Sequence, residues 1–343
     1  MEDRMIAAVF HGVKEGVKVE EVPVPRVTKP DDVLLEVKAG GLCGTDPAIL
    51  EGRHPASVPV ILGHEYAGVV IDVGEAVKGV KPGDHVVIDP NIKCGKCYYC
   101  RNGKQNLCEN MTTLGIFIDG GFTKYNVAPE SAVYRIPEDM DWKDAALVEP
   151  VSCVVNGVRR ARIKPGDNVV IIGAGPIGLI WTALAKRAGA GRVIVSETMQ
   201  KRQKAAEKLG ADIVIDPTLE DPIARVKELT NGRGANVAVE VVGRIVTAQQ
   251  AVEMLAYGGR AVLFGTCPKD ARVPINPYDI MRHEKEIVGS FIANFTFTPA
   301  IQIMYSKLVP SDVLFTHEFK VEGIHKAFQT HKAGESIKVL ITP

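Results

Sequence analysis

The sequence lacks a net charge, a long uninterrupted apolar segment and any internal repeat. Its 41 basic side chains are balanced by 41 acidic ones, so the composition offers no basic field of the kind that a nucleic-acid partner requires. The longest apolar stretch, residues 169–185, contains two glycines before a proline, which is typical of a strand, a turn and a helix rather than a membrane span. We therefore expect neither a nucleic-acid partner nor a membrane partner.

We also expect no secretory signal, because charged residues interrupt the N-terminal stretch MEDRMIAAVF. Seven cysteines are an odd number and do not suit a fully paired disulfide framework. A chain of 343 residues can bury a core without disulfides. Thiolate–metal chemistry in a reducing compartment is the better interpretation, so we expect a cytoplasmic protein.

Two kinds of pattern divide the chain. The first part contains short alternating runs broken by glycine and proline, such as residues 32–40, and predicts a β-rich domain. From about Glu149, strands alternate with helices, which predicts an α/β domain with a parallel sheet covered on both faces. We expect domains at residues 1–152 and 153–290, with residues 291–343 returning to the first. In the second domain the pattern places a helix over residues 245 to 259.

The stretch VVIIGAGPIG joins an apolar strand to the spacing G-x-G-x-x-G. Gly173 would permit a tight turn, Gly175 would let a pyrophosphate approach the backbone, and Gly178 would allow close helix–strand packing. Pro176 and Ile177 would begin a helix whose N-terminus favours anions. The alternative is a glycine-rich turn without a ligand, but the acidic residue that ends the next strand favours a dinucleotide.

That acidic residue is Glu197, which we expect to accept hydrogen bonds from the adenine ribose hydroxyls. A carboxylate at this position repels a 2′-phosphate, so NAD is favoured over NADP. Arg202 follows five residues later and complicates this preference, because it could stack on the adenine or help to hold a phosphate.

Four cysteines gather in residues 94–108. Their spacing is C-x2-C-x2-C-x7-C, at Cys94, Cys97, Cys100 and Cys108. Four thiolates complete a tetrahedral zinc shell and leave no position for a substrate, so this lobe, at about residues 90–110, predicts a structural zinc site. An iron–sulfur run would have a shorter last gap and a proline after it, and a nucleic-acid zinc ribbon would have two separated pairs in basic surroundings.

A second constellation contains Cys43, His64, Glu65 and Glu149. Cysteine, histidine and a carboxylate are suitable zinc ligands, and three of them leave one position open. Each residue also has a structural interpretation: Cys43 as a small buried side chain, His64 as a hydrogen-bonded loop residue, and Glu149 as a carboxylate at a helix N-terminus. The presence of a hydride-carrier motif in the same chain favours the metal.

These motifs together resemble the zinc-dependent medium-chain alcohol dehydrogenases, in their polyol (sorbitol) and threonine dehydrogenase branch. The residues that carry the resemblance are the Cys43–Asp46 and Gly63–Glu65 motifs, the four-cysteine lobe, Glu149 with Pro150, and the Gly173–Gly178 turn. The resemblance implies a GroES-like β-rich catalytic domain and a Rossmann NAD-binding domain with a doubly wound parallel sheet. It also implies two zinc ions per subunit, one catalytic and one structural, and a homotetramer or dimer.

The resemblance further implies roles for single residues. Cys43, His64 and Glu149 would hold the catalytic zinc, while Glu65 is similar to a carboxylate that binds the metal or exchanges with its water. Cys153, four residues after Glu149, is a rival ligand. The hydroxyl of Thr45 would take the substrate proton.

Threonine dehydrogenases usually continue the proton relay through a histidine three residues after that threonine, but this chain has Ala48, which makes threonine a less favoured substrate. His54 is a candidate for the next step, and the nicotinamide ribose together with water is the alternative. The resemblance favours a polyol, sugar, cyclitol or sugar acid as the substrate, and Arg53 and Lys124 are candidate anion clamps. A non-catalytic NAD-binding protein remains the alternative from another class.

Overall fold

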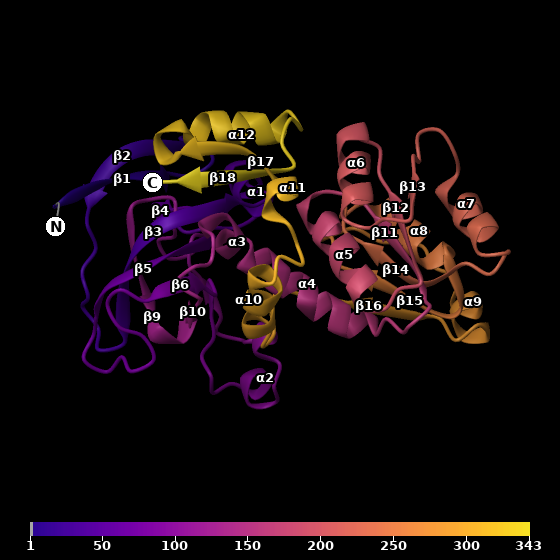
Figure 1. Cartoon of the computed structure of the whole chain (residues 1–343), viewed down its shortest axis with the longest axis horizontal. Helices are drawn as coiled ribbons and strands as arrows, with labels where there is room; N and C mark the ends of the chain where they lie inside the picture. The colour runs from indigo at the N-terminus through magenta and orange to yellow at the C-terminus, as the bar shows by residue number, and fades with distance from the viewer. Residues whose placement is uncertain (1–2) are drawn as a thin grey trace. The chain divides into compact units, whose positions relative to one another are not determined.

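The computed structural model describes residues 3–343, which form two compact units. The first unit contains the chain up to Pro150 together with Asn294–Pro343, and the second unit is Val151–Ala293. The second unit is therefore inserted between two segments of the first, and Figure 1 shows the course of the chain through each. Within residues 3–343, the helices fall short of the length or apolarity that crossing a bilayer requires.

The first unit is rich in antiparallel strands. Across its main sheet the strands are β10 (Val133–Arg135), β6 (His85–Ile88), β5 (Glu65–Val73), β3 (Asp32–Leu42), β18 (Lys338–Thr342) and β17 (Phe315–Lys320), and β9 (Tyr125–Pro129) also pairs with β3. Two smaller sheets contain β2 (Val17–Pro23), β1 (Arg4–Phe10) and β4 (Val60–Ile61), and β7 (Asn91–Ile92) with β8 (Thr112–Thr113). Strand β18 runs antiparallel to β3, with Leu340 opposite Gly41. The last strand of the chain therefore lies beside the strand that leads to Cys43.

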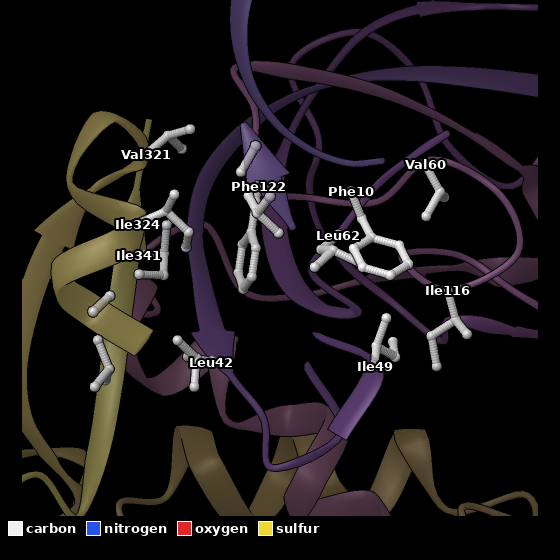
Figure 2. Close-up of a cluster of buried hydrophobic side chains, with 14 residues drawn as sticks. Phe10, Leu42, Ile49, Val60, Leu62, Ile116, Phe122, Val321, Ile324 and Ile341 are labelled. Atoms are coloured by element: carbon white, nitrogen blue, oxygen red, sulfur yellow. The ribbon is translucent and has the colours of Figure 1, made fainter. Parts of the chain in front are cut away.

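Short helices connect these strands. They are α1 (Thr45–Leu50), α2 (Tyr98–Arg101), α3 (Trp142–Ala146), α10 (Phe297–Tyr305), α11 (Ser311–Leu314) and α12 (Ile324–Lys332), with 3-10 turns η1 (Gln105–Leu107), η2 (Glu130–Ala132) and η3 (Val321–Gly323). Helix α12 and strand β18 share a hydrophobic core with the N-terminal part of the chain. Figure 2 shows Ile324 and Ile341 from the C-terminal segment near Phe122 and Leu42. Burying each such side chain contributes about 1.5–3 kcal/mol, so the two segments stabilise each other.

The second unit contains a parallel six-stranded sheet with helices in its connections. The strand order is β13 (Ile213–Ile215), β12 (Arg192–Ser196), β11 (Asn168–Ile172), β14 (Ala235–Glu240), β15 (Leu255–Leu263) and β16 (Glu286–Gly289). The helices are α5 (Pro176–Arg187), α6 (Gln200–Lys208), α7 (Pro222–Leu229), α8 (Ile245–Glu253) and α9 (Pro277–Arg282), and α4 (Val148–Ala161) contains the boundary between the units. The α/β class and the doubly wound parallel sheet, predicted from the sequence, are confirmed.

The order of strands reverses between β11 and β14, where doubly wound sheets bind their ligands. One local prediction is wrong. Helix α8 ends at Glu253, and Leu255 already belongs to strand β15, whereas the sequence pattern placed a helix as far as residue 259. Pairing of Leu255 with Ala235 of β14 replaces the last helical turn.

Candidate active site and metal centres

Three of the predicted metal ligands converge in the first unit. Cys43 follows β3, Glu65 begins β5, and His64 lies just before it. Strands β3 and β5 pair so that Gly41 lies opposite Glu65, which brings the two strand ends together. The ligand atoms of Cys43, His64 and Glu65 all lie within 4.8 Å of one another. This spacing suits a single metal ion bound by sulfur, nitrogen and oxygen.

Asp46, which was not among the predicted site residues, orients two of these ligands. Its side chain is fully buried. One carboxylate oxygen accepts a 2.8 Å hydrogen bond from the Cys43 backbone, and the other lies 3.5 Å from His64 Nδ1. Burial lowers the pKa of His64, but the negative charges of Cys43 and Asp46 outweigh it and raise the pKa well above its ordinary value. The ring therefore lies among anionic groups that favour a cation.

Thr45 is placed next to the cluster. It begins helix α1, and its hydroxyl lies 3.6 Å from the Cys43 sulfur. The ring of His54 makes a local contact, with Nδ1 2.8 Å from the carbonyl oxygen of Pro55. The candidate anion clamps lie elsewhere: Arg53 is exposed and ion-paired to Glu51 at 2.6 Å, and Lys124 lies above the ring of Tyr125.

Glu149 lies in the first turn of α4 and is buried, but it falls outside the set of ligand atoms within 4.8 Å. Its rival Cys153 belongs to the same helix and is also buried. Glu149 is nevertheless close enough to contribute to the electrostatic environment of Lys338, a second residue that was not predicted.

Lys338 begins strand β18, and its side chain is only 3% exposed. The ammonium lies 2.5 Å from Glu65 Oε2 and donates a 3.3 Å hydrogen bond to the carbonyl oxygen of Leu42. Burial lowers the pKa of Lys338, but the charges of Glu65, Cys43 and Glu149 prevail and raise it. The signal in the sequence was a lone lysine at the start of an apolar strand, IKVLITP.

The four-cysteine lobe forms a second cluster. The sulfurs of Cys94, Cys97, Cys100 and Cys108 all lie within 4.8 Å of one another, and none is in a disulfide. Hydrogen bonds from the backbone N–H groups of Lys96 and Cys97 lower the pKa of Cys94 to about 6, whereas burial raises that of Cys100 to about 12. Converging N–H donors of this kind stabilise metal-bound thiolates.

Both clusters fit zinc. In the first, a thiol sulfur, a ring nitrogen and a carboxylate oxygen lie within 4.8 Å of one another, which is a donor set that zinc accepts. In the second, four sulfurs at mutual contact distance match a closed tetrahedral shell.

The glycine-rich turn lies at the switch point of the second unit. Gly173 follows β11 with φ +98°, and a Cβ there would lie 2.6 Å from a methyl group of Val242, just after β14. A Cβ on Gly178 would lie 1.9 Å from the Gly173 carbonyl oxygen. Gly175 caps α5, with Pro176 and Ile177 in its first turn, and faces open space. An anion can therefore approach the N–H groups of this helix end.

Glu197 follows β12, and its buried carboxylate accepts hydrogen bonds from the backbone of Ala174 at 2.7 Å and of Met199 at 2.9 Å. It thereby ties the glycine-rich turn to the next strand end. Arg202 lies in α6, and its Nε is buried without a hydrogen-bond partner among the described residues.

Comparison with known proteins agrees with both units. Residues 29–138 match the family described as alcohol dehydrogenase GroES-like domain, and residues 176–306 match the zinc-binding dehydrogenases. The sorbitol dehydrogenase of Bacillus subtilis is 34% identical over 346 residues, covering 99% of this chain and 97% of that protein. The L-threonine 3-dehydrogenase of Thermococcus kodakarensis is 35% identical over 350 residues, covering 100% and 99%.

A crystal structure from Sinorhizobium meliloti 1021, assigned to the zinc-binding dehydrogenases and bound to NADP, superposes with a TM-score of 0.96 at 34% identity and 100% coverage of both chains. The GroES-like and Rossmann pairing expected from the sequence is confirmed. The chain belongs to the zinc-dependent medium-chain alcohol dehydrogenase superfamily, in its sorbitol and threonine dehydrogenase-like branch, and is an alcohol dehydrogenase that uses zinc and a nicotinamide cofactor.

Proposed function

We propose that this enzyme transfers a hydride between NAD and a secondary alcohol or ketone of a polyol, sugar, cyclitol or sugar acid. The cluster of Cys43, His64 and Glu65 beside the Thr45 hydroxyl carries the proposal, because it joins a metal site to a proton acceptor. The similarity to a sorbitol dehydrogenase supports a polyhydroxylated substrate. The first unit would supply the catalytic site, and the second would bind the cofactor.

Cys43, His64 and Glu149 would hold the catalytic zinc, with Glu65 as a further or exchanging ligand and Cys153 as the rival to Glu149. Zinc bound there supplies Lewis-acid chemistry, which polarises an alcohol oxygen and lowers its pKa. Thr45 would take the hydroxyl proton and pass it toward solvent as the carbinol hydride moves to C4 of the nicotinamide. Oxidation of one alcohol thus yields one ketone, one NADH and one proton.

Gly173, Gly175 and Gly178 would hold the cofactor pyrophosphate against α5, with Pro176 and Ile177 in its first turn. We propose NAD rather than NADP, because the carboxylate of Glu197 is buried at the end of β12, where a ribose 2′-phosphate would meet it. Arg202 is a basic group that favours the opposite choice, and the Sinorhizobium relative does bind NADP.

The second zinc would be structural and bound by Cys94, Cys97, Cys100 and Cys108, because a shell of four sulfurs offers a substrate no position. We place the enzyme in the cytoplasm, where such free thiols persist.

We also propose a homo-oligomer, a dimer or a tetramer. Strand β16 is the last strand of the parallel sheet. Ile287 within it and Phe291 just after it are exposed, so a second copy would pair at this edge and cover them.

Two other functions make different predictions. L-Threonine 3-dehydrogenase activity is supported by the Thermococcus relative but disfavoured by Ala48 in the relay. A non-catalytic NAD-binding protein would tolerate loss of the metal ligands.

The deciding experiment measures NAD⁺ reduction over a panel of polyols, sugars, cyclitols, sugar acids and threonine, with metal analysis of the same sample. We expect turnover of a polyhydroxylated secondary alcohol and two zinc ions per chain. Cys43→Ala should abolish turnover while NADH still binds, and Cys267→Ala, a free thiol in the second unit, is the matched control. Absence of activity on every secondary alcohol, or full activity in Cys43→Ala, would overturn the proposal.

A further inference from the structure

The buried ammonium group of Lys338 lies next to the cluster of Cys43, His64 and Glu65. Neither the family motifs nor the proposed mechanism assigns it a role. A lysine this deeply buried is costly unless its charge is paired. Lys338 meets two partners, the Glu65 carboxylate at 2.5 Å and the Leu42 carbonyl at 3.3 Å. It therefore links one candidate ligand to the backbone that directly precedes another, Cys43.

A glycine in strand β3 makes room for this ion pair. Strand β3 passes directly beside it at Gly41, where a Cβ would lie 2.1 Å from Glu65 Oε2 and 2.9 Å from Lys338 Cε. The positions of both side chains therefore depend on the absence of a side chain at Gly41. The ion pair joins two strands of the sheet, β18 and β5, which lie on either side of β3.

The proposed mechanism requires an open position on the metal. Three protein ligands leave that position, and a fourth permanent ligand closes it. The oxygen atoms of Glu65 are near enough to the ligand atoms of Cys43 and His64 to serve as the fourth. The ammonium of Lys338 competes with a metal ion for the same carboxylate.

We propose that Lys338 is a positioning residue that holds Glu65 back from the catalytic metal and so keeps one coordination position open for the substrate oxygen. This inference rests on the proposed function. Without the ammonium, Glu65 becomes a permanent ligand, the metal is held more tightly, and turnover falls. Outer partners of metal ligands typically change metal affinity or activity by about 10–100-fold, which sets the scale of the effect.

The test replaces Lys338 with Met, which keeps the aliphatic length and removes the charge. We expect zinc transfer from the catalytic site to a chelator to slow by about tenfold or more, and kcat to fall while KM for NAD⁺ is unchanged. With Co²⁺ in the catalytic site, the visible absorption spectrum should change to one typical of a higher coordination number. Lys338→Gln, which can retain the hydrogen bond to the Leu42 carbonyl, tests the charge if the Met variant does not fold.

Two controls separate positioning from general stability. Lys307→Met removes another lysine that pairs with a buried carboxylate, Asp144, in the same unit, and should leave zinc release unchanged. In a Glu65→Gln background, Lys338→Met should no longer slow zinc release. The inference would be overturned if the Lys338 variants released zinc as fast as the wild type or faster. It would also be overturned if Lys338→Met slowed zinc release equally in the Glu65→Gln background. Failure of the proposed function would appear separately, as an inactive wild-type enzyme.

Discussion

The candidate metal cluster shows how the position of a metal-binding side chain depends on a neighbouring residue that does not itself bind the metal. His64 offers one ring nitrogen to the cluster, and Asp46 faces the other from a fully buried position. The same carboxylate accepts the Cys43 backbone hydrogen bond, so one side chain contacts two of the proposed ligands.

We expect Asp46→Asn to weaken zinc binding at the catalytic site by about 10–100-fold, because the neutral amide fixes the ring less firmly and removes a negative charge. Zinc titration against a competing chelator measures this. Asp72→Asn, an exposed carboxylate on β5, is the matched control. Equal zinc affinity in the Asp46 variant and the wild type would show that Asp46 has no such role.

We propose that cofactor choice depends on Glu197. Replacing it with Gln should raise the ratio of kcat/KM for NADP⁺ over NAD⁺ by about tenfold, equal to about 1.4 kcal/mol, because the charge that repels a 2′-phosphate is removed. Steady-state kinetics with both cofactors measures the ratio, and Glu207→Gln, exposed on α6, should not alter it. An unaltered ratio in Glu197→Gln would assign the preference to Arg202 instead.

The four-cysteine lobe and the glycine-rich turn could be proposed from the sequence because local spacing defines them, whereas the roles of Cys43, His64 and Glu149 came from the family resemblance. Asp46 and Lys338 were not predicted, for different reasons. Asp46 lies within the Cys43–Asp46 motif, so a role for it could have been predicted, but none was. Lys338 meets Glu65 only through the pairing of β18 with β3, which local sequence does not reveal.

Secondary-structure elements show the same limit. The alternating strand and helix pattern was sufficient to predict the parallel sheet, because each element carries its own periodicity. The end of α8 was not predictable in this way, since residues 255–259 have a helical pattern but pair with a strand distant in sequence.

Helix α7 offers a test at this scale. Asp221 accepts a 2.9 Å hydrogen bond from the backbone of Ile223 and caps the helix, with Pro222 in its first turn. Asp221→Ala should destabilise the helix by about 0.5–2 kcal/mol. Hydrogen exchange in residues 222–229 measures this, and Asp221→Asn, which can still cap, should retain most of the protection. Full protection in the Ala variant would exclude a capping role.

At the scale of the whole molecule, we expect the two proposed zinc sites to lose their metal independently of each other. The four-cysteine lobe contains Lys96, Arg101 and Lys104, all exposed and all trypsin sites. Removing its metal should accelerate cleavage there, because the sulfurs no longer hold the loop.

Limited proteolysis before and after chelation measures that change. A Cys43→Ser variant, which lacks only a catalytic ligand, should resist trypsin as the wild type does. A lobe that resists trypsin equally with and without metal would show that zinc does not hold it.

The assembly proposal also has a direct test. Ile287→Lys places a charge on β16 at the open edge of the sheet and should convert the oligomer to smaller species. Light scattering after size exclusion measures the mass. Leu219→Lys, at a residue 84% exposed in the same unit, should not change it. An unchanged mass for Ile287→Lys would place the interface elsewhere.

The position of β18 has a consequence for synthesis of the protein on the ribosome. Leu42 and Lys338 are 296 residues apart, and every residue of the second unit is translated between them. The second unit is contiguous and can fold while the chain still grows. Strand β3 meanwhile exposes the edge that β18 will cover, and an open edge invites pairing with other chains. The contacts that β18 makes with β3 and with Glu65 are therefore completed last, after the whole second unit has been synthesised.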